Sequence, residues 1–328
     1  MARKEDKKKK ITAGKIPQPA AAPTTASYEQ VQKLHPLYFN IVKKRYWWFA
    51  LSLLLIIPCV ISLFVQGLNL GIDFTGGTML EVTFKSAASQ TAVSDTLKSV
   101  GLEGTVQFSD NNTALIRTEA LEEDKRNELL DTLQTQVGEF DRDNFKEDKV
   151  GAAIGKELTL NAFWALLIAC GLMIAYITIR FQFAYAISGI IALLHDVLLT
   201  VGIFSLFQWQ IDSSFIAAIL TIFGYSINDT VVIFDRVREN EARLKRGDSY
   251  EDMVDKSIWQ TMRRSLSTVA TVLIVLLAVY ILGGESTRIF ALAMLIGVTL
   301  GAYSSIFNAS QILVEIKRYF KVPAKVKS

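Results

Sequence analysis

The sequence predicts a polytopic α-helical membrane protein with six transmembrane helices and one extracytoplasmic ferredoxin-like α+β domain between the first and second helices. Of the 328 residues 51% are hydrophobic, yet 20% are charged, so the apolar residues must be gathered in blocks. Six segments are almost free of charge, and each is long enough to cross about 30 Å of hydrocarbon as a helix. Between the first two of them, residues 67–156 show the patterns of strands and shorter helices.

The first transmembrane helix is predicted at residues 46–66, and a bundle of five more at residues 157–314. The charge-poor segments themselves are residues 47–66, 158–179, 181–207, 213–234, 265–282 and 289–314. The first is too long for the apolar core of a cleavable signal peptide, and no small-x-small cleavage site follows it. We therefore expect it to span the membrane.

Lysine and arginine residues set the expected orientation. Eleven lie before the first span, seven lie in residues 235–263 and five follow Val314, whereas residues 208–212 contain none. Because positively charged loops stay in the cytoplasm, both termini and the loop at 235–263 are predicted to be cytoplasmic, and residues 67–156 extracytoplasmic. The nine basic residues of that outer segment do not argue against this, since long loops translocate largely regardless of charge.

The outer segment has the rhythm of a small α+β domain. Strands are expected at 79–84, 105–109, 114–118 and 144–150, helices at 90–100 and 121–137, and a turn at 110–112. The order strand, helix, strand, strand, helix, strand is that of a ferredoxin-like layer. No cysteine occurs in this segment, so its fold cannot depend on disulfides.

The cytoplasmic parts are basic. Residues 1–45 are predicted to be a mostly disordered tail, and residues 315–328 a second basic tail. Their charge suits contact with anionic lipids, although a solvated tail is the simpler interpretation. Within the loop at 235–263, an apolar stripe with a spacing of four predicts a helix lying in the membrane interface; it comprises Tyr250, Val254, Ile258 and Met262.

Two acidic residues fall inside predicted spans, Asp196 in the third and Asp229 in the fourth. A charge near the bilayer centre costs about 2.5–3.5 kcal/mol, so such residues are candidates for function. Arg264 opens the fifth span and reaches a depth similar to that of Asp229. Asp229 and Arg264 could form a proton relay or a permanent ion pair that joins two helices, and the residues alone leave both open.

Polar neighbours accompany the two aspartates. Tyr225 and Ser226 precede Asp229 by four and three residues, where their hydroxyls are expected to support either protonation state. His195 precedes Asp196, and because adjacent helical residues point about 100° apart, we expect that both cannot face one small site. Asp196 is therefore a weaker candidate for the relay than Asp229.

Small residues inside the spans are assigned to packing. Gly297 and Gly301 form a GxxxG pair in the sixth span, where close helix packing is the expected role. Cys59 and Cys170 lie in the first and second spans and are expected to act as small buried side chains.

The stretch GIDFTGGT follows the first span. Its glycines, Gly71, Gly76 and Gly77, supply backbone freedom where a helix must turn into a sheet edge. Asp73 is expected to accept hydrogen bonds from local backbone amides. The stretch is either a structural junction alone or a coupling junction that transmits helix movement to the outer domain.

Five motifs carry a family resemblance, and together they cover most of the chain. They are GIDFTGGT, VGAAIGKEL, LLHDVLLTVGIFSL, GYSINDTVVIFDRVREN and FALAMLIGVTLGAYSSIF. In combination they resemble the SecF branch of the SecD/SecF protein-export family, of the resistance-nodulation-division superfamily. In that family the aspartate of GYSxND and an arginine opening the fifth span are implicated in proton transport. The resemblance implies Asp229 and Arg264 for these roles, with Asn228 as polar support.

The fifth span departs from the family pattern of TSxTT-like hydroxyls. Val269 and Val272 stand where the family has hydroxyl residues, while Thr268 and Thr271 are retained. Which of Arg263 and Arg264 is the functional arginine therefore stays open.

The resemblance implies a subunit that pairs with SecD and uses the proton-motive force to promote late-stage translocation of preproteins through SecYEG. It implies the bacterial plasma (inner) membrane as location, the translocating preprotein as substrate, and YidC- or YajC-type accessory proteins as further partners. The main alternative is a half-transporter of the same superfamily that exports a lipid or small molecule with a partner subunit. A scaffold without proton coupling is a third interpretation.

An enzyme is not expected. An intramembrane aspartyl protease built on Asp196 and Asp229 would need a GxGD element, and the chain has Ile227-Asn228-Asp229 instead. No P-loop, metal-ligand cluster or nucleophile elbow occurs in the sequence, so we expect no cofactor, no metal and no ATP use. No nucleic-acid partner is expected either.

Overall fold

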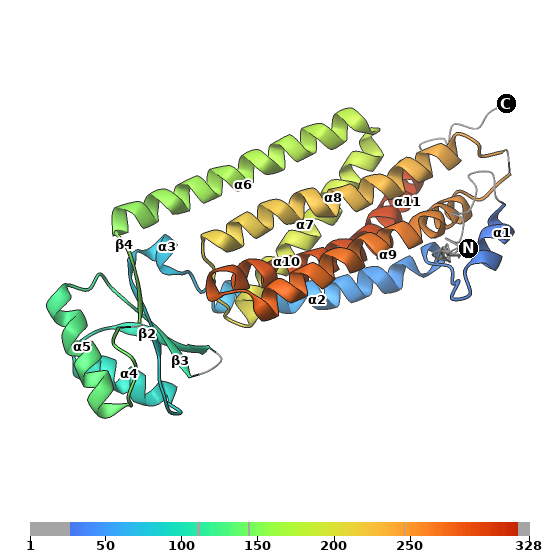
Figure 1. Ribbon diagram of the computed structural model, residues 1–328. Coiled ribbons are helices and arrows are strands. Elements are labelled where there is room, and N and C mark those ends of the chain that lie inside the picture. Colours follow the sequence, from blue (N-terminus) through green and yellow to red (C-terminus); the bar gives the residue numbers. More distant parts are fainter. Residues whose placement is uncertain (1–26, 110–111, 144, 246, 321–328) are drawn as a thin grey trace, which may run out of the picture.

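The computed structural model describes residues 27–109, 112–143, 145–245 and 247–320. In this part six helices are long and apolar enough to cross a membrane, and the small α+β domain lies beyond one end of the helical bundle (Figure 1). The predicted fold class is thereby confirmed. Residues 1–26 of the basic tail, residues 110 and 111 of the expected turn and residues 321–328 lie outside the described residues.

Most of the membrane helices extend beyond the charge-poor segments, whereas the third lies within its segment. They are α2 (Arg45–Val65), α6 (Ala152–Arg180), α7 (Phe183–Leu206), α8 (Ser213–Glu241), α9 (Tyr250–Leu282) and α10 (Glu285–Ser304). The last continues through a π-helical turn, η2 (Ser305–Ala309), into α11 (Ser310–Tyr319). The Asp212 carboxylate accepts from the Phe215 amide at 2.9 Å and so caps the start of α8, as N-cap residues do.

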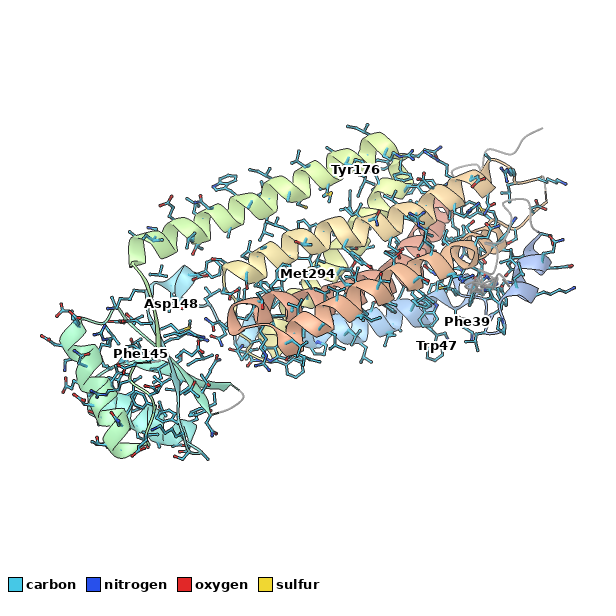
Figure 2. The ribbon with its side chains drawn as sticks, in the orientation of Figure 1. Phe39, Trp47, Phe145, Asp148, Tyr176 and Met294 are labelled. Carbon is cyan, nitrogen blue, oxygen red and sulfur yellow. The ribbon has the colours of Figure 1, made fainter. Side chains whose placement is uncertain are left out.

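Three helices form the centre of the bundle. In their most apolar windows, α7, α8 and the α10–α11 helix are 50% buried, against 17% for α2, 17% for α9 and 6% for α6. Met294 of α10 lies among its neighbours, whereas Trp47 of α2 and Tyr176 of α6 lie on the outside (Figure 2). The exposed apolar side chains of α2, α6 and α9 are those expected to face lipid or a partner helix.

We call the α+β domain the outer domain because it lies beyond one end of the bundle (Figure 1). It has the predicted order of elements, β1 (Gly77–Thr83), α4 (Gln90–Ser99), β2 (Gly104–Ser109), β3 (Thr113–Thr118), α5 (Glu123–Gln136) and β4 (Lys146–Val150). The strands form one antiparallel sheet in the order β2-β3-β1-β4. Leu80 and Ile116 of the sheet pack with Val93 and Leu97 of α4 and Leu129 of α5, and all five are buried. Because β1 is central, the expectation that the junction leads into a sheet edge is wrong.

Glu147 links β4 to α5. Its carboxylate lies 2.9 Å from Arg126 of α5 and 2.9 Å from Lys149. Burial raises the pKa of Glu147, but hydrogen bonds and charges from Lys149 and Arg126 outweigh it and hold the pKa below its usual value.

The N-terminal region is folded from residue 27, so the expectation of a mostly disordered tail up to residue 45 is wrong there. Helix α1 (Tyr28–Leu34) begins with a capping box between Ser27 and Gln30. The fully buried Asp255 of α9 then accepts from Tyr38 Oη at 2.6 Å and from the Ile41 amide at 2.7 Å. These bonds hold the segment before α2, including η1 (Val42–Lys44), against α9.

The loop at residues 235–263 is mostly helical, because α8 continues to Glu241 and α9 begins at Tyr250. Val254 and Ile258 are fully buried against the bundle, so the predicted interfacial helix is wrong. Lys317 of α11 is also buried and pairs with Glu241, which accepts from Tyr185 Oη at 2.5 Å. Residues 315–319 therefore belong to the bundle and not to a free tail.

Candidate functional site

Asp229 lies on the inner side of α8, where α8 faces α9. Its carboxylate is buried, with 9% of the residue exposed. Ser265 Oγ of α9 donates a hydrogen bond of 2.6 Å to Oδ1. Oδ2 is buried and has no hydrogen-bond partner among the described residues. A buried carboxylate with one unmatched oxygen is unfavourable when charged, and protonation of that oxygen relieves this.

Arg264 lies beside Ser265 on α9, and its side chain is exposed. It acts electrostatically on Asp229. In the described part of the chain no ion pair within 4.0 Å joins Arg264 to Asp229, so the two charges are coupled at longer range. Such a pair can change its separation without breaking a direct bond.

Exposed polar residues also lie along α8 before Asp229 and along α9 from Arg264 onward. On α8 they include Thr221 and Asn228, and on α9 Arg264, Thr268 and Thr271. We call these five residues the α8–α9 polar face. Polar side chains at membrane depth are unfavourable against lipid, so this face requires water or another helix over it.

Asp196 forms a second buried centre, between α7, α8 and α10. The residue is fully buried, and its Oδ2 accepts from Ser226 Oγ and Ser304 Oγ, both at 2.6 Å. Its Oδ1 lies 2.9 Å from His195 Nδ1. The expectation that His195 and Asp196 cannot share one small site is wrong, because the imidazole reaches back to the neighbouring carboxylate.

Asn308 extends this centre to α2. Its amide nitrogen lies 3.3 Å from His195 Nε2 and donates to Ser52 Oγ at 2.8 Å. Asn308 belongs to the π-helical turn η2, whose extra residue per turn shifts the side chains that follow. Thr230, next to Asp229, bonds Ser305 of the same turn at 2.8 Å. Turn η2 thus contacts the surroundings of both aspartates.

Two residues expected to support Asp229 make no hydrogen bond to it among the described residues. Ser226 donates to Asp196, and Tyr225 Oη is buried without a hydrogen-bond partner among the described residues. The expected support of Asp229 by both hydroxyls is wrong, since the α8 rotation turns Ser226 toward α7 and α10. Ser265 of α9 takes that place.

The GxxxG pair lies at the closest approach of α10 to α8. A Cβ on Gly297 would lie 2.1 Å from Ile222 Cδ1, and one on Gly301 would lie 3.2 Å from Ser226 Cβ. Between α7 and α2, a Cβ on Gly202 would lie 2.3 Å from Cys59 Cβ. At Gly297 and Gly202 any side chain would force the facing residue or the helix to shift, whereas at Gly301 the contact would only be tight.

The junction after α2 touches both the bundle and the domain. Gly71 N donates to Ile211 O at 2.8 Å, and the short helix α3 (Ile72–Thr75) follows. Asp73 Oδ2 accepts from the Ser213 amide at 2.8 Å, so it caps α8 rather than its own local backbone. Gly77, with φ 123°, would place a Cβ 2.3 Å from Thr118 O.

Gly76 sits at the entrance to α6. Its φ is 73°, in the region that favours glycine, and a Cβ there would lie 2.8 Å from Ala152 Cα. The GIDFTGGT stretch therefore contacts α8, β3 and α6 within a few residues.

Arg117 is a residue that the sequence analysis missed. It projects from β3 toward the bundle, is buried, and donates to Gln107 Oε1 at 2.8 Å and to Gln210 Oε1 of the α7–α8 connection. Burial lowers the pKa of Arg117 to about 10, although Asp212 nearby acts in the opposite direction. The only signal in the sequence was a single charge within the apolar strand TALIRT.

Among the described residues, no group of three or more His, Cys, Asp or Glu side chains is placed to hold a metal ion. The titratable groups at the two aspartates are carboxylates and one imidazole. Their surroundings consist of hydroxyl and amide side chains.

Comparison with known families gives two matches along the chain. Residues 130–319 match the family described as Protein export membrane protein SecD/SecF, C-terminal, and residues 61–88 match the SecD/SecF GG Motif. The second match contains the GIDFTGGT junction.

Individual relatives give the same result. The chain is 41% identical to the protein translocase subunit SecF of Sebaldella termitidis over 88% of this chain and 95% of the relative. It is 34% identical to the SecF of Escherichia coli O157:H7, over 88% and 91%. A crystal structure of SecDF from Thermus, described as a translocon-associated membrane protein, superposes with a TM-score of 0.79 at 34% identity. That match covers 86% of this chain but only 39% of the SecDF chain.

Proposed function

Since this chain belongs to the SecF branch of the SecD/SecF family of protein-export membrane proteins, we propose that it pairs with SecD and uses the proton-motive force to promote late-stage translocation of preproteins through SecYEG. It is a multi-pass protein of the bacterial inner membrane with a SecF-like role in protein export. It acts as a transport subunit and carries out no enzymatic step of its own.

The main support for proton coupling is Asp229 Oδ2, which is buried and has no hydrogen-bond partner among the described residues. Protonation from one side of the membrane neutralises this buried carboxylate, and release to the other side restores its charge. Arg264 stabilises the charged form from α9 without a direct ion pair. Each change of charge alters the attraction between α8 and α9, so proton passage is converted into helix movement.

Asp196 and His195 form the second proton-holding group of the relay. His195 Nδ1 lies 2.9 Å from Asp196 Oδ1, and Ser226 and Ser304 each donate a hydrogen bond to Asp196 Oδ2. Turn η2 contacts the surroundings of both centres, which supports movement of the two as a unit.

The α8–α9 polar face supports an obligate partner. In the membrane, Asn228, Arg264 and Thr268 need a polar cover, and transmembrane helices of SecD would supply it. The solved SecDF chain, of which this chain matches 39%, is consistent with such a pairing.

The orientation follows from the positive charge of the loop and tails. Residues 67–156 lie on the extracytoplasmic side, and the ends of α8 and α9 that carry Glu241 and Tyr250 lie in the cytoplasm. In that orientation the junction 71–77 transmits movement of α8 and α6 to the outer domain. The outer domain then acts on the emerging preprotein.

The test is export into vesicles that contain SecYEG, SecD and this chain, with and without a proton gradient. Asp229→Asn keeps the shape of the side chain and an acceptor for Ser265 but cannot exchange a proton. We expect the gradient-dependent part of export to be lost in this variant. Asp148→Asn, at β4 of the outer domain, is the matched control. Gradient-dependent export that survives Asp229→Asn would remove the relay and leave a scaffold.

A further inference from the structure

A groove separates the outer domain from the outer end of the bundle. It has a volume of about 440 Å³ and is lined by β2 and β3, by the α7–α8 connection, and by the facing ends of α9 and α10. The sheet carries its helices on the opposite face, so the face holding Leu115 and Gln107 looks into the groove (Figure 1). The volume lies within the range of ligand sites in proteins.

Four glutamines give the groove its polar character. Gln107 and Gln210 accept hydrogen bonds from Arg117 through their oxygens, which leaves their amide N–H groups as donors. Gln90 and Gln208 donate through their nitrogens, which leaves their amide oxygens as acceptors. Donors and acceptors thus line the same groove, as binding of peptide groups requires.

Aromatic side chains supply the rest of the lining. Phe207 is 60% exposed and stacks on Trp209 with ring centres 4.8 Å apart, and Phe108 and Tyr280 also line the groove. No carboxylate is among the described lining residues. The guanidinium of Arg288, which also lines the groove, lies over the Tyr280 ring at 5.2 Å. Amides and aromatic rings accept side chains of many kinds, so most of the lining selects for an extended chain and not for a sequence.

Strand β2 offers a template for that chain. It is an edge strand of the sheet, and Gln90 Nε2 donates to its Val106 carbonyl at 2.8 Å. The side-chain amide of Gln90 occupies the place that the N–H of an added strand would take. An incoming extended segment can replace it and gain main-chain hydrogen bonds along β2.

We propose that this outer groove binds an extended segment of the exported polypeptide. The proposal rests on the proposed role in protein export, which supplies an unfolded chain on this side of the membrane. The segment lies along β2, with its peptide groups bound by the glutamines and its side chains against Phe108, Phe207 and Trp209. Because Arg117 and Gln210 join the groove to the bundle, a bound segment contacts the elements that the junction moves.

The test is photo-crosslinking in vesicles that contain SecYEG, SecD and the full chain. The probe is a preprotein arrested in the translocon by a folded C-terminal domain. A benzophenone amino acid is placed at Phe108 or Phe207 in the groove, or at the exposed Gln134 of α5 as the matched control. We expect crosslinks to the arrested preprotein from the two groove positions and none from position 134.

A second variant examines the lining. Phe207→Ala removes one aromatic contact from an exposed position of the groove, so crosslinking from Phe108 should fall roughly tenfold. Gln134→Ala should leave it unchanged. Equal crosslinking in both variants overturns the proposal.

The other possible crosslinking results also support or overturn the proposal. Crosslinks from Phe108 and Phe207 to SecD, with or without the arrested preprotein, overturn the proposal because the groove is then a subunit contact. Absence of preprotein crosslinks while export still depends on Asp229 overturns the groove and leaves the proposed function intact. Crosslinks from the groove together with export that ignores Asp229→Asn support the groove and overturn the proton relay alone.

Discussion

Gly297→Ala tests the contact between the helix that carries Asp229 and α10. The added Cβ would lie 2.1 Å from Ile222 Cδ1 and 2.5 Å from Ile222 Cγ1. Carbon atoms in contact are normally about 3.5–4.0 Å apart, so the helices must separate by roughly 1.5 Å or the fully buried Ile222 must leave its position. Overpacking of this kind costs about 1–3 kcal/mol.

The assay is thermal unfolding of the purified chain in detergent, combined with a double-mutant cycle. We expect Gly297→Ala to lower the midpoint by at least about 2 °C. Ile222→Ala removes the clashing atoms. The loss of unfolding free energy in the double variant should therefore be smaller, by about 1–3 kcal/mol, than the sum of the losses in the two single variants. Gly171→Ala on α6 is the matched control, since no heavy atom lies within 4 Å of its Cβ position. Equal midpoints for Gly297→Ala and Gly171→Ala, or simple additivity in the cycle, would refute the close-packing argument.

Three further predictions concern the ends of the helices and the outer domain. Asp73→Ala removes the acceptor for the Ser213 amide and should lower stability by about 1 kcal/mol in thermal unfolding, whereas Asp73→Asn should retain most of it; equal losses would contradict the capping role. Asp255→Ala leaves Tyr38 Oη and nearby amides without an acceptor, so protease cleavage within residues 27–45 should increase, and unchanged cleavage would show that other contacts hold the segment. Because the folded pKa of Glu147 lies below its usual value near 4.5, its contribution to stability is present above that pH and is lost as the pH falls through the folded pKa. The protection factors of amides in α5 and β4, which correct for the intrinsic exchange rate at each pH, should therefore fall in acid, and less so in Glu147→Gln.

Much of the fold could be predicted because its signals are local. A charge-poor run must be buried in lipid or protein whatever surrounds it, so the six spans followed from composition. The α+β order of the outer domain followed from periodicity in the same way. The ends of α8 and α9 were harder to predict, because both helices continue through polar residues, such as Asn240 and Asp255, that other parts of the chain bury.

The candidate site could be predicted only in part. Asp229 and Asp196 could be predicted because an acidic residue at membrane depth costs free energy and is therefore a candidate for function. Their partners did not, since Ser265 meets Asp229 across two helices and Ser226 turns to Asp196 instead. Arg117 was missed because one arginine in a strand is unremarkable until the bundle buries it.

The sequence by itself determined which segments enter the membrane, which segment folds outside the bundle, and which carboxylates lie at membrane depth, because each depends on the transfer of nearby residues between water and hydrocarbon. Only the tertiary structure decided which hydroxyl reaches which carboxylate, that Asp73 caps α8, and that a groove opens between the domain and the bundle. Those features depend on the rotation and depth of helices relative to one another. Side-chain packing between distant segments sets both quantities, and no local pattern encodes them.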